Sequence, residues 1–287
     1  MLNNAGKESK FIDGKLISSE ILERLKLERQ SVNKDLSLEV FWVGNDKATE
    51  SFVKIKASFA EKIGINFILR HFDEISEEEL LEQIEKSKAD ALLLQLPLAE
   101  NIDKDKAIES IKSRQDLDVL KRETYNIFKN ASLSKLDSIL LPPVAGAVYE
   151  IIKKYKIKSK GKKAVVLGNG MLVGKPVFEL LKKYDFAELA VFDLNSDPQE
   201  LKKALLEADL LVSGTGSPGL VKADMIKAGV VLIDAGTSSQ KAKNGLLGDI
   251  DLDCGQKASL FARSPGGVGP VTVAVLYQNL IKLAKNK

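Results

Sequence analysis

The chain has one cysteine and one histidine among its 287 residues. A single cysteine, Cys254, excludes an intramolecular disulfide and a metal cluster held by several thiolates. A single histidine, His71, removes most zinc chemistry and the serine–histidine–aspartate arrangement of nucleophilic catalysis. We therefore expect no metal site in this protein.

Long hydrophobic runs and an excess of one charge sign are also missing. The 43 basic and 40 acidic residues give a formal net charge of +3, which offers no case for a nucleic-acid or anionic-membrane partner. The most basic stretch, at 153–163, is interpreted as a solvated helix end and linker. Residues 1–10 contain no apolar signal region and no run is long enough to span a membrane, so we expect a soluble cytoplasmic protein.

Helix-like and strand-like patterns alternate through the first half of the chain. Helices are expected at 12–28, 49–63 and 76–88, and strands at 37–44, 64–72 and 89–98. The third helix begins with a capping box, in which Ser76 is followed by Glu79. Strands that alternate with helices of about 10–15 residues predict an α/β fold with a parallel sheet.

The second half resumes this alternation after an irregular stretch. Residues 116–141 lack clear periodicity and end at two prolines. The elements expected next are a helix at 145–155, strands at 164–167, 189–192, 210–213 and 230–234, and an apolar helix from Val271. A glycine- and proline-rich loop, expected to be rigid, precedes that last helix. Because 287 residues suffice for two domains, we expect two α/β domains.

The most informative stretch, at 162–176, has the sequence KKAVVLGNGMLVGKP. An apolar strand there ends in Gly168, Gly170 and Gly174 and passes directly into a helical pattern. Glycines at such a turn let the backbone approach a pyrophosphate, which then lies on the helix N-terminus. Packing alone also produces such turns. However, Asp193 follows about 25 residues after Gly168, near the spacing at which an acid hydrogen-bonds a ribose, so the sequence predicts a dinucleotide site.

Seven segments, in order along nearly the whole chain, resemble those of one enzyme family. They are IDGK (12–15), VGNDKATESFVKIKASFAEKIGI (43–65), LLLQLPL (92–98), GNGMLVGKP (168–176), VKADMIKAGVVLIDAG (221–236), GDID (248–251) and PGGVGPVT (265–272). The family is that of the bifunctional methylenetetrahydrofolate dehydrogenase/methenyltetrahydrofolate cyclohydrolase enzymes, and PGGVGPVT is its most specific segment here.

The resemblance implies a particular domain organisation. A catalytic, folate-binding α/β domain is expected from 1–144 and 265–287, and a Rossmann-like NAD(P)-binding domain from 145–264. The C-terminal helix is expected to return to the first domain, with folate and nicotinamide held in a cleft between the two. The resemblance also implies a homodimer.

Three polar residues match the catalytic positions of that family. Lys56 matches the central lysine of the cyclohydrolase step, although the sequence alone also allows a surface lysine. It can accept a proton from water only if desolvation or a neighbouring cation lowers its pKa. Gln95 matches the residue that contacts and orients this lysine, and Asp118 the acid that grips the pterin ring through two N–H groups. Asp116 competes for that role, but in the family pattern the second of two acids binds.

The folate site has further expected members and three departures from the family pattern. The resemblance assigns to substrate binding Phe52, Gly266, Gly267, Pro270 and Thr272. Phe52 stands where tyrosine is usual, which keeps an aromatic face but removes a hydroxyl that could hydrogen-bond Lys56. Val119 stands where glycine is usual, and Pro142–Pro143 lies where the family has Pro-Cys-Thr-Pro. These changes leave the balance between the two activities open.

The nucleotide side also departs from relatives that use NADP, which commonly carry Arg-Ser after the first glycine and His-Ser after the next strand. This chain has Asn169–Gly170 and Asp193–Leu194 there. An arginine would grip a 2′-phosphate, whereas an aspartate repels it and accepts from a ribose hydroxyl, so we predict NAD in preference to NADP. The expected cofactor residues are Gly168, Asn169, Gly170, Val173, Gly174, Asp193, Thr215 and Thr237.

The sequence therefore predicts an enzyme that oxidises 5,10-methylenetetrahydrofolate with NAD or NADP and hydrolyses the methenyl product to 10-formyltetrahydrofolate. One alternative is a relative that keeps a single activity, which the changes at Phe52 and Val119 make credible. A second is a folate- or nucleotide-binding protein without catalysis, against which the lysine at 56 argues. A third is another two-domain dehydrogenase, which has no evident need for the glycine-rich loop at 265–272.

Overall fold

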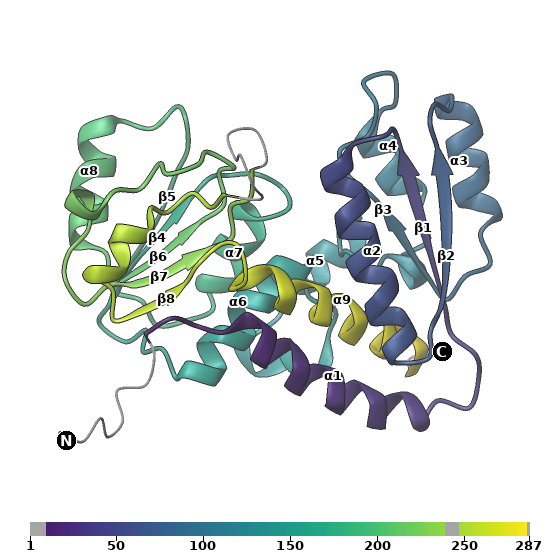
Figure 1. Cartoon of the computed structure of the whole chain (residues 1–287), viewed down its shortest axis with the longest axis horizontal. Coiled ribbons are helices and arrows are strands. Elements are labelled where there is room, and N and C mark those ends of the chain that lie inside the picture. Colours follow the sequence, from purple (N-terminus) through teal and green to yellow (C-terminus); the bar gives the residue numbers. More distant parts are fainter. Residues whose placement is uncertain (1–9, 239–246, 286–287) are drawn as a thin grey trace, which may run out of the picture. The chain divides into compact units, whose positions relative to one another are not determined.

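The computed structural model describes residues 10–238 and 247–285 of the chain (Figure 1). The chain forms two compact units, each built from two segments. Unit 1 contains Met1–Ile17 and Ala147–Val271, and unit 2 contains Ser18–Gly146 and Thr272–Lys287. The boundaries between the units fall within three helices: α1 (Gly14–Gln30), α6 (Pro143–Tyr155) and α9 (Val268–Lys285).

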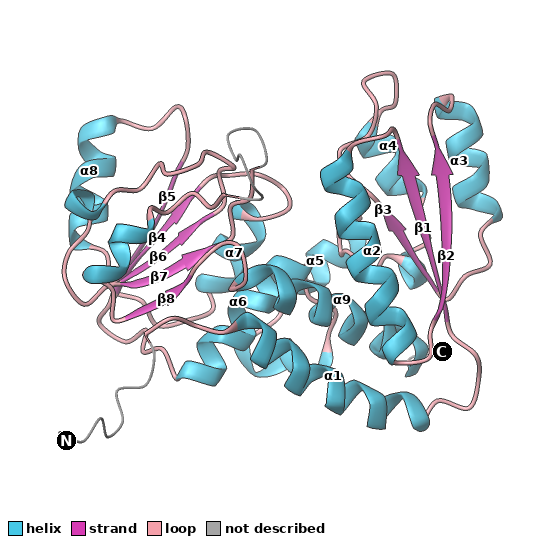
Figure 2. Cartoon of the chain, viewed as in Figure 1, coloured by secondary structure: helices cyan, strands magenta, loops and turns pink. Residues whose placement is uncertain are grey.

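Unit 2 is built around a parallel sheet of three strands in the order β2-β1-β3 (Figure 2). The strands are β1 (Ser37–Val43), β2 (Asn66–Phe72) and β3 (Ala91–Leu94). The helices that lie wholly within the unit are α2 (Lys47–Lys62), α3 (Glu77–Lys86), α4 (Lys104–Ser110) and α5 (Arg122–Asn130). The central strand and β3 are almost entirely buried, which explains their unbroken apolar sequences. The capping box predicted at Ser76 and Glu79 is present at the start of α3.

Unit 1 contains a five-stranded parallel sheet in the order β5-β4-β6-β7-β8. The strands are β4 (Lys163–Leu167), β5 (Glu188–Phe192), β6 (Leu210–Ser213), β7 (Val231–Asp234) and β8 (Leu260–Ala262), and the helices are α7 (Gly174–Leu181) and α8 (Pro198–Glu207). One face of the sheet packs a core that includes Val165, Leu211, Leu232 and Phe261. The predicted α/β class with two parallel-sheet domains is therefore confirmed.

Several short elements were not predicted. They are α4, α5, α8, β8 and four 3₁₀ turns at Ser113–Gln115, Leu133–Ser138, Ala223–Met225 and Leu252–Gln256. Helix α5 has only nine residues, of which Thr124 and Phe128 are buried, and this is shorter than the window over which helical periodicity is read from a sequence.

The predicted start of the last helix, Val271, was wrong. Helix α9 begins at Val268, so Pro270 and Thr272 belong to its first turns and not to a loop. Proline is tolerated there because the first N–H groups of a helix have no partner within the helix. Within the described residues, none of the helices has the length and apolar character needed to cross a bilayer.

Candidate functional site

In unit 2, Lys56 and Gln95 meet although they lie on different elements. Helix α2 is capped by Asp46, whose side chain accepts a hydrogen bond from the N–H of Thr49. Its next turns carry Lys56, whose Nζ donates to Oε1 of Gln95 at 2.7 Å. Gln95 directly follows β3, and its own N–H bonds the carbonyl of Phe41 in β1 at 2.8 Å. The helix thus positions the amine, and the sheet edge positions the amide.

Asp118 completes this group through its charge. Burial lowers the pKa of Lys56, and the negative charge of Asp118 opposes this fall. Burial also raises the pKa of Asp118 to about 6, against the pull of the Lys56 ammonium and with the help of the Asp116 charge. The structure therefore brings Lys56, Gln95 and Asp118 together, and it shifts the amine in the direction that a general base needs at neutral pH.

The carboxylate of Asp116 is hydrogen-bonded within its own loop. It is buried beside β3, where it forms an isolated bridge with Leu92. Its two carboxylate oxygens accept from the N–H of Leu120 at 3.2 Å, from the N–H of Lys121 at 2.9 Å and from the hydroxyl of Thr124. Because the loop already occupies both oxygens, Asp116 has less to offer a ligand than Asp118.

The loop between these acids and α5 has an unusual backbone. Val119, which stands where a glycine was expected, has a φ of 57° and is fully buried. A β-branched residue is strained in this left-handed region. The hydrogen bonds from Leu120 and Lys121 to Asp116 hold the backbone that directly follows Val119. They therefore oppose relaxation of the turn that carries Asp118.

Three other predicted folate-site residues belong to different units: Phe52 to unit 2, and Gly266 and Gly267 to unit 1. Phe52 is half-buried on α2, one helical turn before Lys56. Gly266, which has a φ of 105°, and Gly267 belong to unit 1. The carbonyl of Gly266 accepts from the N–H of Gly14 at 3.1 Å, and a Cβ on Gly14 would lie 1.7 Å from the carbonyl oxygen of Gly267.

Pro270 and Thr272 fall on either side of the unit boundary. Pro270 belongs to unit 1, whereas Thr272 opens the second segment of unit 2. Both are half-buried residues of α9. These two residues are therefore held rigidly by a helix, and not by the rigid loop that the sequence predicted.

In unit 1, the glycine turn after β4 is as tight as the sequence predicted. Gly168 has a φ of 93°, and Gly174 begins α7. A Cβ on Gly174 would lie 1.9 Å from the carbonyl oxygen of Gly168, and a Cβ on Gly214 would lie 2.1 Å from a methyl of Val173. By contrast, a Cβ on Gly170 would meet nothing within 4 Å. The inner side of the turn is therefore closed by packing, while the backbone at Gly170 and the exposed Asn169 faces open space.

The remaining predicted nucleotide residues follow neighbouring strands. The sheet pairs Leu167 with Phe192 and with Ser213, so Gly168, Asp193 and Gly214 continue along one sheet edge. Asp193 is exposed, and its Oδ1 accepts from the N–H of Asn195 at 3.0 Å. This is the edge at which open parallel sheets bind ligands.

Thr215 and Thr237 follow β6 and β7 at the same edge. The N–H of Thr215 donates to Oδ2 of Asp249 at 2.6 Å, and its hydroxyl accepts from the N–H of Ser217 at 3.1 Å. Thr237 is exposed. The buried carboxylate of Asp249 also accepts from the hydroxyl of Ser213 at 2.7 Å, so one acid holds the end of β6 and the start of the Thr215 loop.

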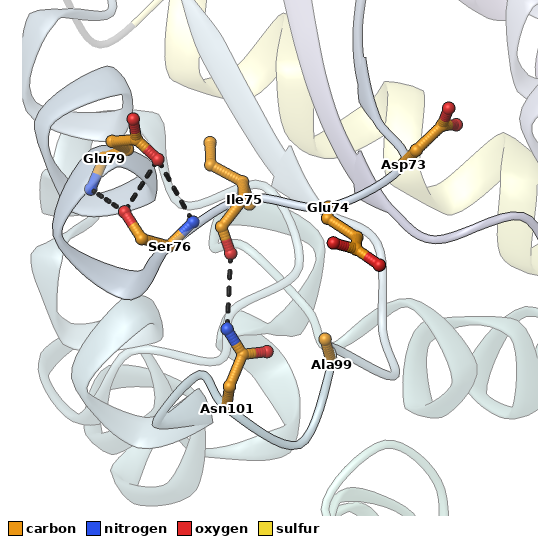
Figure 3. A pocket seen from close by; sticks show the side chains of 7 residues that line it. All are labelled: Asp73, Glu74, Ile75, Ser76, Glu79, Ala99 and Asn101. Carbon is orange, nitrogen blue, oxygen red and sulfur yellow. Dashed lines mark hydrogen bonds between the residues drawn. The ribbon is translucent and has the colours of Figure 1, made fainter.

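A pocket of about 570 Å³ lies elsewhere in unit 2 (Figure 3). It is lined by Asp73, Glu74, Ile75, Ser76, Glu79, Ala99 and Asn101. Two of these side chains form the capping box of α3, and the Asn101 amide bonds the Ile75 carbonyl at 3.4 Å. None of the predicted site residues lines it, and its polar groups serve the local structure.

Three buried polar residues that organise these sites were not predicted: Tyr277, Asn279 and Asp249. Asn279 carried a usable signal, because an amide within an apolar helix must find partners when it is buried. Asp249 lies in the GDID segment, which was noted only for its resemblance. Tyr277 gave no signal, since an aromatic residue in an apolar helix is ordinary core.

Together these features define a two-domain α/β protein that has a dinucleotide-binding type of sheet edge in unit 1 and a centre built on a half-buried lysine in unit 2. The family described as "Tetrahydrofolate dehydrogenase/cyclohydrolase, catalytic domain" matches residues 12–118, and "Tetrahydrofolate dehydrogenase/cyclohydrolase, NAD(P)-binding domain" matches residues 142–287. The chain belongs to the tetrahydrofolate dehydrogenase/cyclohydrolase family, as its sequence segments predicted.

Relatives and solved structures agree with this assignment. The chain is 35% identical to the "Bifunctional protein FolD" of Aquifex aeolicus over 96% of each chain. The crystal structure of the bifunctional FolD dehydrogenase/cyclohydrolase of Campylobacter jejuni is similar, with a TM-score of 0.87, 32% identity and coverage of 96% of this chain and 98% of that one. A Trypanosoma brucei dehydrogenase-cyclohydrolase, complexed with NADP and an inhibitor, has a TM-score of 0.86 at 28% identity and covers 96% of this chain and 97% of its own.

Proposed function

We propose that this protein oxidises 5,10-methylenetetrahydrofolate to the 5,10-methenyl form with NAD or NADP, and then hydrolyses that product to 10-formyltetrahydrofolate. The similar proteins of Aquifex aeolicus and Campylobacter jejuni are named as bifunctional enzymes of this kind. The observation that carries the proposal is the hydrogen bond between Lys56 and Gln95, together with the charge coupling between Lys56 and Asp118.

The hydrolytic step follows from the state of the Lys56 amine. Burial lowers the pKa of this amine, so that a neutral form is available to accept a proton from water. The water oxygen attacks the electron-poor methenyl carbon, and the bond from that carbon to N5 then breaks. Both protons of the attacking water leave its oxygen as the formyl C=O forms: one passes to N5, the other is released to solvent, and the carbon remains on N10 as a formyl group. Gln95 fixes the amine by accepting a hydrogen bond from it through Oε1.

Substrate binding is assigned to Asp118 and to apolar and backbone groups. The Asp118 carboxylate has the geometry to accept two hydrogen bonds from adjacent N–H groups of a pterin ring. Phe52, one turn before Lys56, offers an aromatic face. We assign Gly266, Gly267, Pro270 and Thr272 to the same substrate, on the strength of the PGGVGPVT segment.

The groups of unit 1 fit a dinucleotide. A Cβ would collide inside the Gly168–Gly174 turn, whereas the space outside Gly170 is open to a pyrophosphate. The candidate holders are the turn residues Gly168, Asn169, Gly170, Val173 and Gly174 and, along the sheet edge, Asp193, Thr215 and Thr237. A nicotinamide group bound there supplies the hydride acceptor. The chain's own task in that step is to orient folate, and no protein acid is required.

We further propose that the cofactor is NAD in preference to NADP. The exposed Asp193 follows β5 beside the glycine turn, where its charge repels a 2′-phosphate and accepts from a ribose hydroxyl. Steady-state kinetics with both cofactors test this. A clearly higher kcat/KM with NADP would overturn it.

Two structural proposals accompany this function. The catalytic domain is assigned to 1–144 and 265–287 and the nucleotide domain to 145–264, on the basis of the family resemblance. A homodimer is proposed on the same basis, and sedimentation equilibrium tests it. A protein that remains monomeric at the concentrations used in assays contradicts the dimer.

The decisive experiment for the hydrolytic role is Lys56→Ala, compared with Lys54→Ala on the same helix. We expect hydrolysis of methenyltetrahydrofolate to fall by about a thousandfold in the first variant, since general-base groups contribute about 10²–10⁴-fold. Folate binding should survive. Lys54 is 72% exposed in an ion pair with Glu50, so its removal should leave the rate unchanged. An unchanged rate in Lys56→Ala removes this lysine from the mechanism.

A single-activity enzyme is the second candidate, which the altered residues Phe52 and Val119 favour. Parallel assays of oxidation and hydrolysis on the wild-type protein separate the two candidates. Measurable rates in both assays support the bifunctional enzyme. A rate in only one assay supports the single-activity relative, and a rate in neither supports a binding protein.

A further inference from the structure

Two buried polar residues of the last helix, α9, bond main-chain carbonyls at or next to Lys56 and Asp118. Tyr277 is fully buried, and its hydroxyl donates to the carbonyl oxygen of Lys56 at 2.7 Å. Asn279 is also fully buried, and its Nδ2 donates to the carbonyl of Leu117, the residue before Asp118, at 3.0 Å. One helix therefore bonds the backbone at Lys56 and at the residue before Asp118.

The Tyr277 contact falls within the hydrogen-bond ladder of α2. In a regular α-helix the carbonyl of residue 56 accepts from the N–H of residue 60. The Tyr277 hydroxyl bonds that carbonyl and also interacts with the backbone of Ala60. These contacts restrain the turn of α2 that begins at Lys56. The Tyr277 ring stacks on Phe59, with centroids 4.9 Å apart, so the hydroxyl is held in place from two sides.

The Asn279 contact joins two loops to the helix. Besides bonding Leu117, its Nδ2 donates to the carbonyl of Leu141 at 2.8 Å, and its Oδ1 accepts from the N–H of Leu141 at 3.1 Å. All the polar atoms of this buried amide thus have partners. On the other side of Asp118, Asp116 bonds the N–H groups of Leu120 and Lys121. The backbone that carries Asp118 is therefore tied at both ends.

We propose that the last helix sets the separation between the Lys56 amine and the Asp118 carboxylate, with Tyr277 and Asn279 as positioning residues. The inference rests on the proposed hydrolytic function of that pair. It also gives Tyr277 a role that Phe52 cannot fill. Phe52 lies one turn before Lys56 and has no hydroxyl, so restraint of the lysine is supplied from α9 through the main chain.

The separation matters because the two groups tune one another. The charged neighbour that acts on Lys56 is Asp118, and those that act on Asp118 are Lys56 and Asp116. Burial is the larger influence on the amine and lowers its pKa. A looser turn admits water to the amine, and its pKa then rises towards the ordinary value. The unprotonated amine, which is the form that accepts a proton, then becomes scarcer at neutral pH.

The test is Tyr277→Phe, which removes one oxygen and keeps the stack on Phe59. We expect the rate of methenyltetrahydrofolate hydrolysis at pH 7 to fall about threefold and its pH profile to move up by about half a unit, as the loss of one hydrogen bond allows. The reactivity of Lys56 towards an acylating reagent, followed by peptide mass spectrometry across pH, should shift by the same amount. The matched control is Tyr149→Phe, which alters another buried tyrosine, in unit 1, and should move neither profile.

Asn279→Asp provides a second variant. It keeps the acceptor for the N–H of Leu141 and removes the donors to the carbonyls of Leu117 and Leu141, so we expect KM for folate to rise more than kcat falls. If this variant does not fold, Tyr277→Phe decides the question alone. A Tyr277→Phe protein with a lower melting temperature but unchanged pH and reactivity profiles would make the contact purely structural and overturn the inference. A wild-type protein without hydrolysis defeats the proposed function instead, while the Lys56 reactivity profile still tests the positioning.

Discussion

The two candidate sites of this molecule are built from different kinds of chemical group. In unit 2 the site consists of side chains: an amine, an amide and a carboxylate that are partly withdrawn from water, of which the amine and the carboxylate shift each other's pKa. In unit 1 it consists mainly of backbone, with glycines that leave no room for a Cβ on one side and open space on the other. Its only charged member, Asp193, is exposed.

This difference predicts how each site fails. The lysine centre depends on charge and on the positions of long side chains, so it is sensitive to the removal of one functional group. The glycine turn depends on the path of the main chain, so it is sensitive to added volume. Because a bifunctional enzyme reports on both sites in one sample, each activity serves as a control for the other.

Of the substitutions that add or remove volume, Gly174→Ala is expected to have the largest effect. The new Cβ would lie 1.9 Å from the carbonyl oxygen of Gly168, so the turn has to open. We expect NAD(P) affinity to fall by more than about a hundredfold, roughly the 3 kcal/mol of a severe packing clash, while hydrolysis of methenyltetrahydrofolate is retained. Fluorescence titration of the cofactor and an absorbance assay of hydrolysis measure the two.

Gly269→Ala is the matched control for this substitution. It adds the same methyl group in the first turn of α9, where nothing lies within 4 Å. Both activities should be preserved. Loss of hydrolysis in Gly174→Ala, at a temperature where the protein is folded, would show that the two sites do not fail independently.

The glycine turn could be predicted from sequence because its signal is local. A strand, three glycines and a helix lie within about fifteen residues, and each has a direct physical meaning there. The lysine centre is different. Lys56 and Gln95 are 39 residues apart, and no periodicity indicates that an amine on α2 meets an amide after β3. Only the family resemblance connected them.

Other parts of unit 2 could not be predicted because tertiary contacts fix them. The stretch at 116–141 lacked a pattern, yet it contains α5 and a loop held by the carboxylate of Asp116. The positive φ of Val119 is contrary to the preference of a β-branched residue. Likewise, α9 starts before Pro270, because the first turn of a helix has no need of that residue's missing N–H.

A smaller effect is expected from the pH dependence of stability that a buried acid of unit 1, Asp234, produces. Asp234, at the end of β7, accepts from the N–H groups of Gly236, Asp249 and Ile250, yet burial raises its pKa from 3.8 to about 7. An acid with a raised pKa binds its proton more tightly when folded. Its contribution to the free energy of unfolding therefore falls as the pH rises from about 4 to about 7, and is constant above.

Asp234→Asn removes this titration. We expect the variant to be less stable at pH 5 but to lose less stability than the wild type between pH 5 and pH 8. Urea denaturation at both pH values, followed by intrinsic fluorescence, measures the difference. Asp224→Asn, at an exposed acid of the same unit, should keep the wild-type slope. Parallel slopes in all three proteins would remove Asp234 from the pH dependence.

The smallest effect is expected at Val119, where strain and burial oppose each other. Val119→Gly relieves a left-handed valine, worth about 1–2 kcal/mol, and loses a buried side chain worth about 1.5–3 kcal/mol, so the protein should be destabilised by only about 1 kcal/mol. Val119→Ala loses most of the same burial but keeps a Cβ at a φ of 57°. Alanine should therefore be the more destabilising replacement, which reverses the usual order of the two residues. Urea denaturation of both variants decides this, and an alanine variant more stable than the glycine variant would show that the backbone around Asp118 carries no strain.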